Sequence, residues 1–305
     1  MFRFREPKIK IIYKGSYGDK EWNMIHGVAD GYQPQMVEAF MQAVERTKGN
    51  ININEMRSAL EIVSINGVME SIPWGIFESE MVKISLIYKA VFDSAGEKSI
   101  PFLPRGIRMN ASFNTLNPKS LDYIKDHTGK LIVEITEETR KAVRTIINDA
   151  FVEGLHPYES AKEISKIVGL TERQARAVNN LRRTLIIQKL SDKVIEQRTR
   201  AYARDLLIYR SRNIARTETI TAANMGQQSL WLQSVEQGLL DTATTRRKWI
   251  TTPDDRLCAW CNSLNGKIVG LEESFGTPLL SGKSYISLTP TLHPHCRCAM
   301  GLVFI

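Results

Sequence analysis

The sequence lacks any run of eighteen apolar residues, and its first residues, Met1-Phe-Arg-Phe-Arg5, contain no apolar stretch of signal-peptide length. These absences argue against a membrane-spanning helix and against a secreted protein. Proline is missing from residues 158–252, so nothing in that stretch interrupts long helices. We therefore expect a soluble chain, made in the cytosol, with an extended helical middle section.

Cysteine is scarce, with four in 305 residues, and all four lie near the C-terminal end. They form two short runs, Cys258-Ala-Trp-Cys261 and Cys296-Arg-Cys298, and His293 precedes the second run. A Cys-x-x-Cys pair can present two thiolates to one ion from a tight turn, and tetrahedral zinc then needs two further ligands. The spacing predicts a structural zinc site built from Cys258, Cys261 and two of His293, Cys296 and Cys298.

Closing the chain between the two runs costs about 3 kcal/mol of entropy, whereas a structural zinc contributes on the order of 10 kcal/mol. Two disulfides are an alternative, but a reducing cytosol disfavours them, and unlinked thiols are another. A catalytic zinc would keep a coordination position open for water and would need a nearby carboxylate base. Asp254 and Asp255 are close in sequence, yet Pro253-Asp254-Asp255 is equally typical of a turn.

The composition, 43% hydrophobic and 24% charged, is that of an ordinary folded protein. The net charge of +8 is concentrated in residues 172–216, which hold twelve basic and four acidic side chains. Acids within this segment are too few to pair with these bases, so a positive surface is predicted that suits DNA phosphates or an acidic partner. The alternative is that these basic residues lie on helix faces that contact only solvent. The candidate basic face comprises Arg173, Arg176, Arg182, Arg183, Arg198 and Arg200.

Helical signals dominate the chain from residue 111 to 240. Asn117-Pro118 predicts a short helix, Thr136 is a candidate N-cap of the next helix, and Gly154 is a candidate end. Thr171-Glu-Arg-Gln174 matches a capping box that opens a third helix, which runs past Ile187. Ser191 or Asp192 then opens a fourth helix. The pattern predicts an antiparallel helical core that ends in one or two long basic helices.

The flanking regions differ from this core. Residues 8–13 alternate like a strand and precede a turn at residues 15–18, Pro34 is predicted in the first turn of a helix that ends at Gly49, and Asn54 is a candidate cap of the next helix. After Gly238, Arg247 opens a predicted strand, and Asn265-Gly266 is a hairpin signal. We expect a mainly α (α+β) protein with three parts: an N-terminal α+β docking region (1–110), the helical domain (111–240) and a β-rich zinc knuckle (241–305).

Ala215-Arg-Thr-Glu218 and Asn224 lie on the last predicted helix, just before the cysteine region. We interpret Arg216, Glu218 and Asn224 as a structural motif, an ion-pair network that fixes this helix, in preference to an active site. These residues, Trp249, Cys258 and Cys261, Asn265-Gly-Lys267 and the final run from His293 to Cys298 occur together in one order. This ordered set resembles the phage Mu protein F family of minor head, or head morphogenesis, proteins over residues 115–302.

The resemblance implies a structural component of a tailed-phage virion, present in few copies in the capsid interior or at the portal vertex, and assembled in the host cytoplasm. It implies the portal protein as partner, with the major capsid or scaffold protein and packaged DNA as further candidates, and a role in procapsid assembly and DNA packaging or delivery. It also implies that Cys258, Cys261, His293, Cys296 and Cys298 are metal-ligand-like positions. Thr289-Pro-Thr-Leu-His293 departs from the Pro-Pro often seen before the last His-Pro in the family.

A non-enzymatic protein is the leading hypothesis, because the sequence offers no nucleophile or acid–base constellation. The alternative hypothesis is a zinc-stabilised, DNA-binding nuclease or an injected virion enzyme, with the basic helices holding DNA. Residues 1–110 lie outside the resemblance and are predicted to be a virion-specific docking region.

Overall fold

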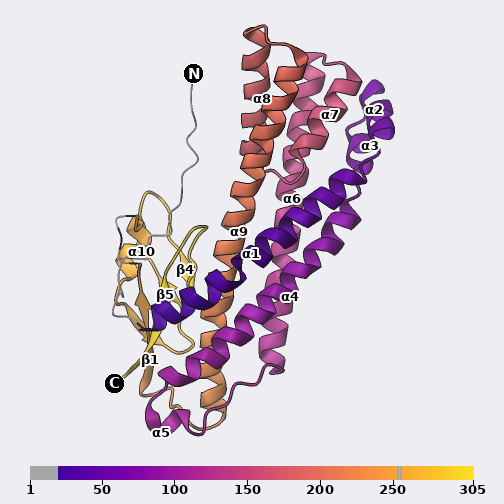
Figure 1. The fold of residues 1–305 in the computed structure, drawn as a ribbon. Coiled ribbons are helices and arrows are strands. Elements are labelled where there is room, and N and C mark those ends of the chain that lie inside the picture. Colours follow the sequence, from indigo (N-terminus) through magenta and orange to yellow (C-terminus); the bar gives the residue numbers. More distant parts are fainter. Residues whose placement is uncertain (1–19, 253, 255) are drawn as a thin grey trace.

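The computed structural model describes residues 20–252, 254 and 256–305. Its elements are mainly helices, with short antiparallel strands near the C-terminal end, which confirms the predicted fold class. In Figure 1 the helices form an elongated bundle, and the strands lie at the side of its lower half, next to the beginning of α1. Within the described ranges no helix is both long and apolar enough to cross a membrane. The strand expected at residues 8–13 and its turn lie outside the described residues.

The described N-terminal part is helical. It contains α1 (Lys20–Gly49), α2 (Ile53–Glu61), α3 (Ile65–Glu70) and α4 (Trp74–Ser99). Helix α1 ends at Gly49 as predicted, but it starts fourteen residues before Pro34, which lies inside the helix. Ile25, Val28 and Ala29 are buried at helical spacing and continue the apolar stripe on the N-terminal side of Pro34. The cap of α2 is Asn52 and not Asn54, because the Asn52 side chain accepts from the amide of Glu55.

A single-turn 3-10 helix, η1 (Ile100–Phe102), and the short α5 (Arg105–Arg108) lead to α6 (Pro118–Glu153). Asn117 caps α6, Pro118 occupies its first turn, and Gly154 ends it with a φ of 61°, as predicted. The predicted break at Thr136 is wrong, because α6 runs through it without interruption. The Thr136 hydroxyl donates to the Ile132 carbonyl one turn earlier, and the buried positions continue on both sides of it.

Three further helices complete the bundle: α7 (Pro157–Ile167), α8 (Glu172–Ile187) and α9 (Asp192–Glu236). The capping box predicted at Thr171 and Gln174 is present in both directions. Helix α9 has 45 residues, which corresponds to a length of about 68 Å. Figure 1 shows α9 running from the tip of the bundle, beside α8, down to the strands. The expectation of long helices at the end of this region is therefore confirmed.

Helices α1, α4 and α9 form the centre of the larger core, and α6 packs against α4. The second half of α9 is buried on nearly all sides, including its polar residues Asn224, Gln227 and Gln228. At Gly226 the backbone of α9 touches α4, where a Cβ atom would lie 2.0 Å from the carbonyl oxygen of Phe92. Glycine is needed here because any side chain would force the two helices apart.

The C-terminal part consists of six short elements around a second apolar core. They are β1 (Thr245–Ile250), α10 (Ala259–Leu264), β2 (Ile268–Gly270), β3 (Phe275–Gly276), β4 (Ile286–Ser287) and β5 (Ala299–Phe304). Strand β1 is central and pairs antiparallel with both β2 and β5, with Arg247 opposite Val269 and Leu302. Asn265-Gly266 does not close a two-residue hairpin as predicted. It joins α10 to β2, because Leu264 on its N-terminal side is helical.

Contacts with α9 connect the three predicted parts of the chain. Helices α1 and α4 lie along α9, and β5 also contacts both α1 and α9. The described elements of residues 20–110 and the C-terminal strands therefore both rest on the same central helix. The division at residues 110 and 240 stays a prediction.

Candidate metal centre

Two turns bring the cysteines together. Cys258 is the N-cap of α10, and its sulfur accepts from the amide of Cys261 at 3.3 Å, which points both side chains to the same side. In the second turn the Cys296 amide donates to the His293 carbonyl at 3.1 Å. Cys298 immediately precedes β5. Because β1 pairs with both β2 and β5, the sheet places the end of α10 next to the turn before β5.

The five candidate ligands form two overlapping groups that share Cys261. The ligand atoms of Cys258, Cys261 and His293 lie within 4.8 Å of one another, and so do those of Cys261, Cys296 and Cys298. His293 Nε2 is 3.1 Å from the Cys258 sulfur and 3.3 Å from the Cys261 sulfur. The sulfurs of Cys261 and Cys296 are 3.6 Å apart.

These separations fit the size of a tetrahedral zinc site. With Zn–S bonds of about 2.3 Å and Zn–N bonds of about 2.0 Å, tetrahedral angles place two sulfurs roughly 3.7 Å apart, and a sulfur and a nitrogen roughly 3.5 Å apart. The donor set of thiols and an imidazole also suits zinc better than magnesium or calcium, which take oxygen ligands. The cluster can therefore hold a metal ion.

Burial separates the cluster from water. Cys261, Cys296 and Cys298 are each at most 2% exposed and belong to the apolar core of the C-terminal part, together with Trp249 and Phe275. Hydrogen bonds from the thiols of Cys261 and Cys298 lower the pKa of Cys296 to about 3. The pKa of the donating Cys261 thiol is raised for the same reason. Without a cation, the neighbouring thiols therefore favour a single thiolate, at Cys296, and the other sulfurs stay protonated. A bound cation would stabilise thiolates at the sulfurs that coordinate it.

Backbone hydrogen bonds fix the second turn on the helices. The Arg297 carbonyl accepts from Trp22 Nε1 at 3.0 Å and from His26 Nε2 at 3.1 Å, both on α1. The Asn224 amide on α9 donates to the Cys298 carbonyl at 3.3 Å. Helices α1 and α9, which are far apart in the sequence, therefore hold the carbonyls of the consecutive residues Arg297 and Cys298.

Of the two carboxylates that precede the cysteines, the described one, Asp254, is already engaged. Asp254 accepts two hydrogen bonds from the Arg297 guanidinium, at 2.5 and 2.8 Å, and two from Arg256, one from its amide and one from its guanidinium, both at 3.2 Å. The hydrogen bond from Arg297 is the largest reason why the pKa of Asp254 is lowered. Asp255 lies outside the described residues. Asp254 is thus held as an anion between two arginines, which does not suit a base for a catalytic zinc.

The three residues of the predicted helix motif point in different directions. Glu218 is 8% exposed and accepts from His127 Nε2 of α6 at 2.8 Å. Asn224 contacts the Cys298 carbonyl, as described above. Arg216 is partly buried and forms no ion pair within the described residues. Of the three residues, Glu218 has a partner of the kind that an ion-pair network requires, namely His127. That Arg216, Glu218 and Asn224 act together as a structural motif stays a prediction.

Acids from the same or a neighbouring helix pair with four of the six arginines of the candidate basic face. Arg176 pairs with Glu172, Arg200 with Glu196, Arg182 with Glu163 of α7, and Arg183 with Glu153 of α6. The count of acids within residues 172–216 missed the carboxylates supplied by α6 and α7. Arg173 and Arg198 are exposed and have no ion pair in the part of the chain that the structure describes. That these six arginines bind DNA or a partner stays a prediction.

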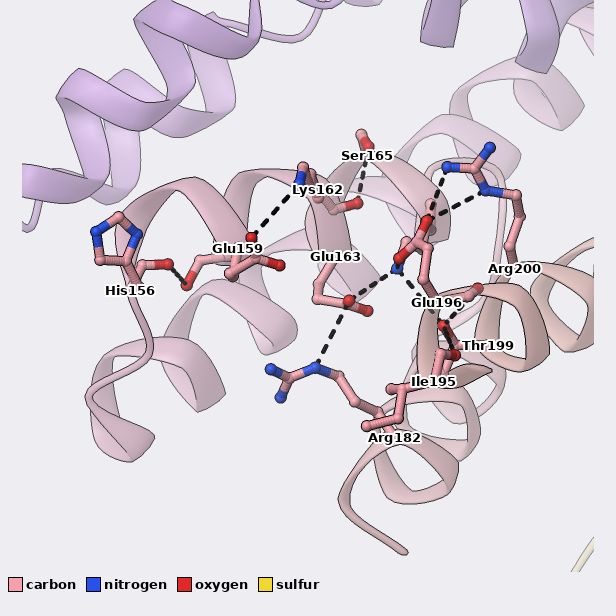
Figure 2. Close-up of polar contacts among 12 residues, drawn as sticks. His156, Glu159, Lys162, Glu163, Ser165, Arg182, Ile195, Glu196, Thr199 and Arg200 are labelled. Atoms are coloured by element: carbon pink, nitrogen blue, oxygen red, sulfur yellow. Dashed lines mark hydrogen bonds and ion pairs between the residues drawn. The ribbon is translucent and has the colours of Figure 1, made fainter. Parts of the chain in front are cut away.

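A buried lysine joins α7 to α9 at this end of the bundle. Lys166 is 8% exposed and donates to Glu163 at 2.7 Å, to Glu196, and to the Thr199 hydroxyl at 3.5 Å. Figure 2 shows Glu163, Arg182, Glu196 and Arg200 converging from the three helices α7, α8 and α9. These charges hold the helices together, so they are not free for a partner.

Arg247 is a residue whose importance the sequence did not reveal. It is fully buried in the middle of β1, opposite β2 and β5. Its guanidinium donates to the carbonyls of Gly270, Leu288 and Glu273 and to the side chain of Gln228 on α9. Burial lowers its pKa to about 10, so it remains charged at neutral pH. Backbone carbonyls in place of a carboxylate stabilise this charge, and no local sequence signal marks that arrangement.

Comparison with known proteins gives one match. Residues 186–301 match the family described as "Phage Mu protein F like protein". No curated protein and no solved structure matches the chain. The match covers all of α9 and the whole metal centre, and it confirms the predicted resemblance for that segment.

Proposed function

Because residues 186–301 match the phage Mu protein F like family, we propose that this chain is a head morphogenesis protein of a tailed bacteriophage. In this proposal it is a minor capsid component, present in few copies, that associates with the portal. It acts in procapsid assembly and in DNA packaging or delivery. The family match is the observation that carries the proposal.

The metal centre supports a structural role within this function. Three of the candidate ligands are buried, and Asp254 is engaged by two arginines. These features favour a closed site over one that keeps a position open for a reacting water. We propose zinc as the ion, which would fasten the turn containing Cys296 and Cys298 to α10. Through Trp22, His26 and Asn224, the same ion would stabilise the contact between this turn and the helices.

Contact with packaged DNA would use the positive charges left on α8 and α9. Of the six predicted arginines, Arg173 and Arg198 are exposed and unpaired within the described residues, which makes them the best placed to reach phosphates. Binding of this kind should be independent of sequence and should weaken as salt rises.

The decisive experiment examines the virion. Mass spectrometry of purified particles should find the chain at a small fraction of the major capsid protein, and cross-linking of procapsids should join it to the portal. Disruption of its gene should reduce the yield of DNA-filled heads, with tails still made. Fully infectious particles without the chain would contradict the proposal. Cross-links only to tail proteins would contradict the portal association.

A further inference from the structure

The thiols of the metal centre follow an order from the surface to the core. Cys258 is partly exposed, whereas Cys261 and Cys296 are each 2% exposed. The sulfurs of Cys258 and Cys261 lie within 4.8 Å of each other, and those of Cys261 and Cys296 are 3.6 Å apart. An oxidant in water therefore meets Cys258 first, and Cys261 connects Cys258 to the buried sulfur of Cys296.

The sulfurs of Cys261 and Cys296 are already in van der Waals contact. A disulfide has a sulfur–sulfur bond of about 2.05 Å, so torsion of the two side chains has to close the remaining distance of roughly 1.5 Å. Both are free thiols, one on α10 and one on the turn before β5. The sulfur of Cys298 lies within 4.8 Å of both, which makes it the competing partner.

Chain connectivity favours a bond between Cys261 and Cys296 over one between Cys258 and Cys261. The latter two are close in sequence, so a bond between them closes a very small loop. Cys261 and Cys296 are 35 positions apart, and a bond that closes a longer loop removes more freedom from the unfolded chain. The longer link also fastens α10 to the turn before β5, the same two segments that a zinc ion would fasten.

We propose that, when zinc is not bound, Cys261 and Cys296 form a disulfide through a relay that starts at Cys258. With hydrogen peroxide as the oxidant, the Cys258 thiol takes up an oxygen atom, which gives a sulfenic acid and releases one water. The Cys261 thiol attacks the oxidised sulfur, the sulfur–oxygen bond breaks and a second water leaves. The Cys296 thiol then attacks the Cys261 sulfur and displaces Cys258 as a thiol.

The relay depends on Cys261, because its sulfur lies near those of both other cysteines. In total, two thiols lose two electrons and two protons, which reduce one peroxide molecule to two waters. The disulfide would keep α10 fastened to the turn before β5 when the chain leaves a reducing compartment and loses its ion. This inference goes beyond the proposed role in the phage head and does not depend on it.

The test maps disulfides in the full chain, prepared zinc-free with a chelator and zinc-loaded, after treatment with hydrogen peroxide equimolar to the chain. Trypsin yields peptides 257–267 with Cys258 and Cys261, 284–297 with Cys296, and 298–305 with Cys298. In the zinc-free chain, non-reducing mass spectrometry should find 257–267 joined to 284–297, and fragmentation should place the bond on Cys261. The zinc-loaded chain should form this bond at least about tenfold more slowly, because the ion binds the same sulfurs.

Other products would overturn the proposal. They are a bond within 257–267 as the final product, a bond from 257–267 to 298–305, and a mixture of all pairings. The mixture would mean that the zinc-free turns do not hold the sulfurs in the observed order. An equal rate with and without zinc would contradict the claim that the ion and the disulfide use the same sulfurs.

Two variants distinguish the relay from direct oxidation of the buried thiols. Cys258→Ser removes the exposed thiol and should slow formation of the bond by about tenfold, with the same final product. Cys261→Ser should give no link between 257–267 and 284–297. A wild-type rate in Cys258→Ser would refute the relay, and a link from Cys258 to Cys296 in Cys261→Ser would refute the requirement for Cys261.

A stability measurement shows whether the disulfide can take the place of the ion. The oxidised zinc-free chain should have a Tm about 5 °C above that of the reduced zinc-free chain. Addition of a reductant should abolish the difference. An oxidised chain with the same or a lower Tm would show that the bond does not fasten the two segments, and would overturn that part of the proposal.

Discussion

Gly226 of α9 lies in direct contact with the backbone of Phe92 in α4, so that a Cβ atom at residue 226 would be 2.0 Å from the Phe92 carbonyl oxygen. The two helices approach each other here more closely than side chains allow. This contact joins the described N-terminal part to the helix that carries the metal-binding turn.

Gly226→Ala should therefore destabilise the protein by at least about 2–3 kcal/mol, because the backbone of one helix must move. Gly129→Ala is the matched control. Gly129 is exposed within α6 and nothing lies within 4 Å of its added Cβ, so alanine should stabilise by about 0.5–1 kcal/mol through helix propensity. Urea unfolding followed by circular dichroism measures both. Equal stabilities of the two variants would mean that the close approach is absent in solution.

Metal content should depend on Cys261 more than on Cys298. The shortest contacts link His293 to Cys258 and Cys261, and Cys261 to Cys296. An ion beside Cys261 can reach these four with little movement. Cys261→Ser should lose the ion, whereas Cys298→Ser should retain about one zinc per chain, as measured by mass spectrometry of the metal. Retention in Cys258→Ser together with loss in Cys298→Ser would assign the ion to the other group.

Removal of the Arg247 guanidinium should be costly. Arg247→Met leaves the carbonyls of Gly270, Leu288 and Glu273 without a donor inside the core. The expected loss of stability is about 3 kcal/mol or more. The neighbouring Arg246, which is less buried and donates only to nearby carbonyls of its own segment, is the control. Arg246→Met should change stability by less than about 1 kcal/mol. Similar losses in both variants would refute the special role of Arg247.

Acid should weaken the fold through His26. Burial lowers the pKa of His26 to about 4 in the folded protein, against 6.5 in an unfolded chain. The unfolded state therefore binds the proton more readily, and stability falls as pH drops from 6.5 towards 4. Between pH 7 and pH 5 the loss attributable to His26 is about 2 kcal/mol. His26→Gln keeps a donor for the Arg297 carbonyl but cannot titrate, so it should lose less stability over the same interval. Parallel pH curves for the two proteins would exclude this contribution.

Lys166 should matter more than its neighbour Lys162. Lys166→Met leaves Glu163 and Glu196 without their shared buried partner, and the expected cost is about 2–4 kcal/mol. Lys162 is only partly buried, with its side chain 41% exposed, pairs with Glu159 and lies over the Tyr158 ring. Lys162→Met should therefore cost less than about 1 kcal/mol. Chemical denaturation of both variants provides the comparison, and a small effect at Lys166 would contradict its role in holding α7 to α9.

Features set by a few neighbouring residues were predicted well from the sequence. The capping box at Thr171 and Gln174, the start at Asn117-Pro118 and the stop at Gly154 each depend on contacts within one helical turn. The predicted helix start at Thr136 was wrong. A threonine can cap the N-terminus of a helix, or it can lie inside a helix and donate its hydroxyl to a carbonyl of the preceding turn. Only the packing around the residue decides which of the two occurs.

Features that depend on tertiary packing were not predicted. The carboxylates that neutralise Arg182 and Arg183 come from α7 and α6, and the acceptors of Arg247 come from three separate segments. The sequence did predict that the four cysteines lie close together in the fold, because a zinc site restricts which residue types can be ligands and how they are spaced. The shared position of Cys261 in two groups could not, because it depends on how the turns fold.

The burial of α9 has a practical consequence for dissecting this molecule. The family match begins at residue 186, but from Ala215 to Ser234 the helix is covered largely by α1 and α4, which lie outside that match. A truncated polypeptide limited to residues 186–301 would present this surface to water and should aggregate when expressed alone. Co-expression with residues 20–110 as a separate polypeptide should restore solubility, since it returns the two covering helices.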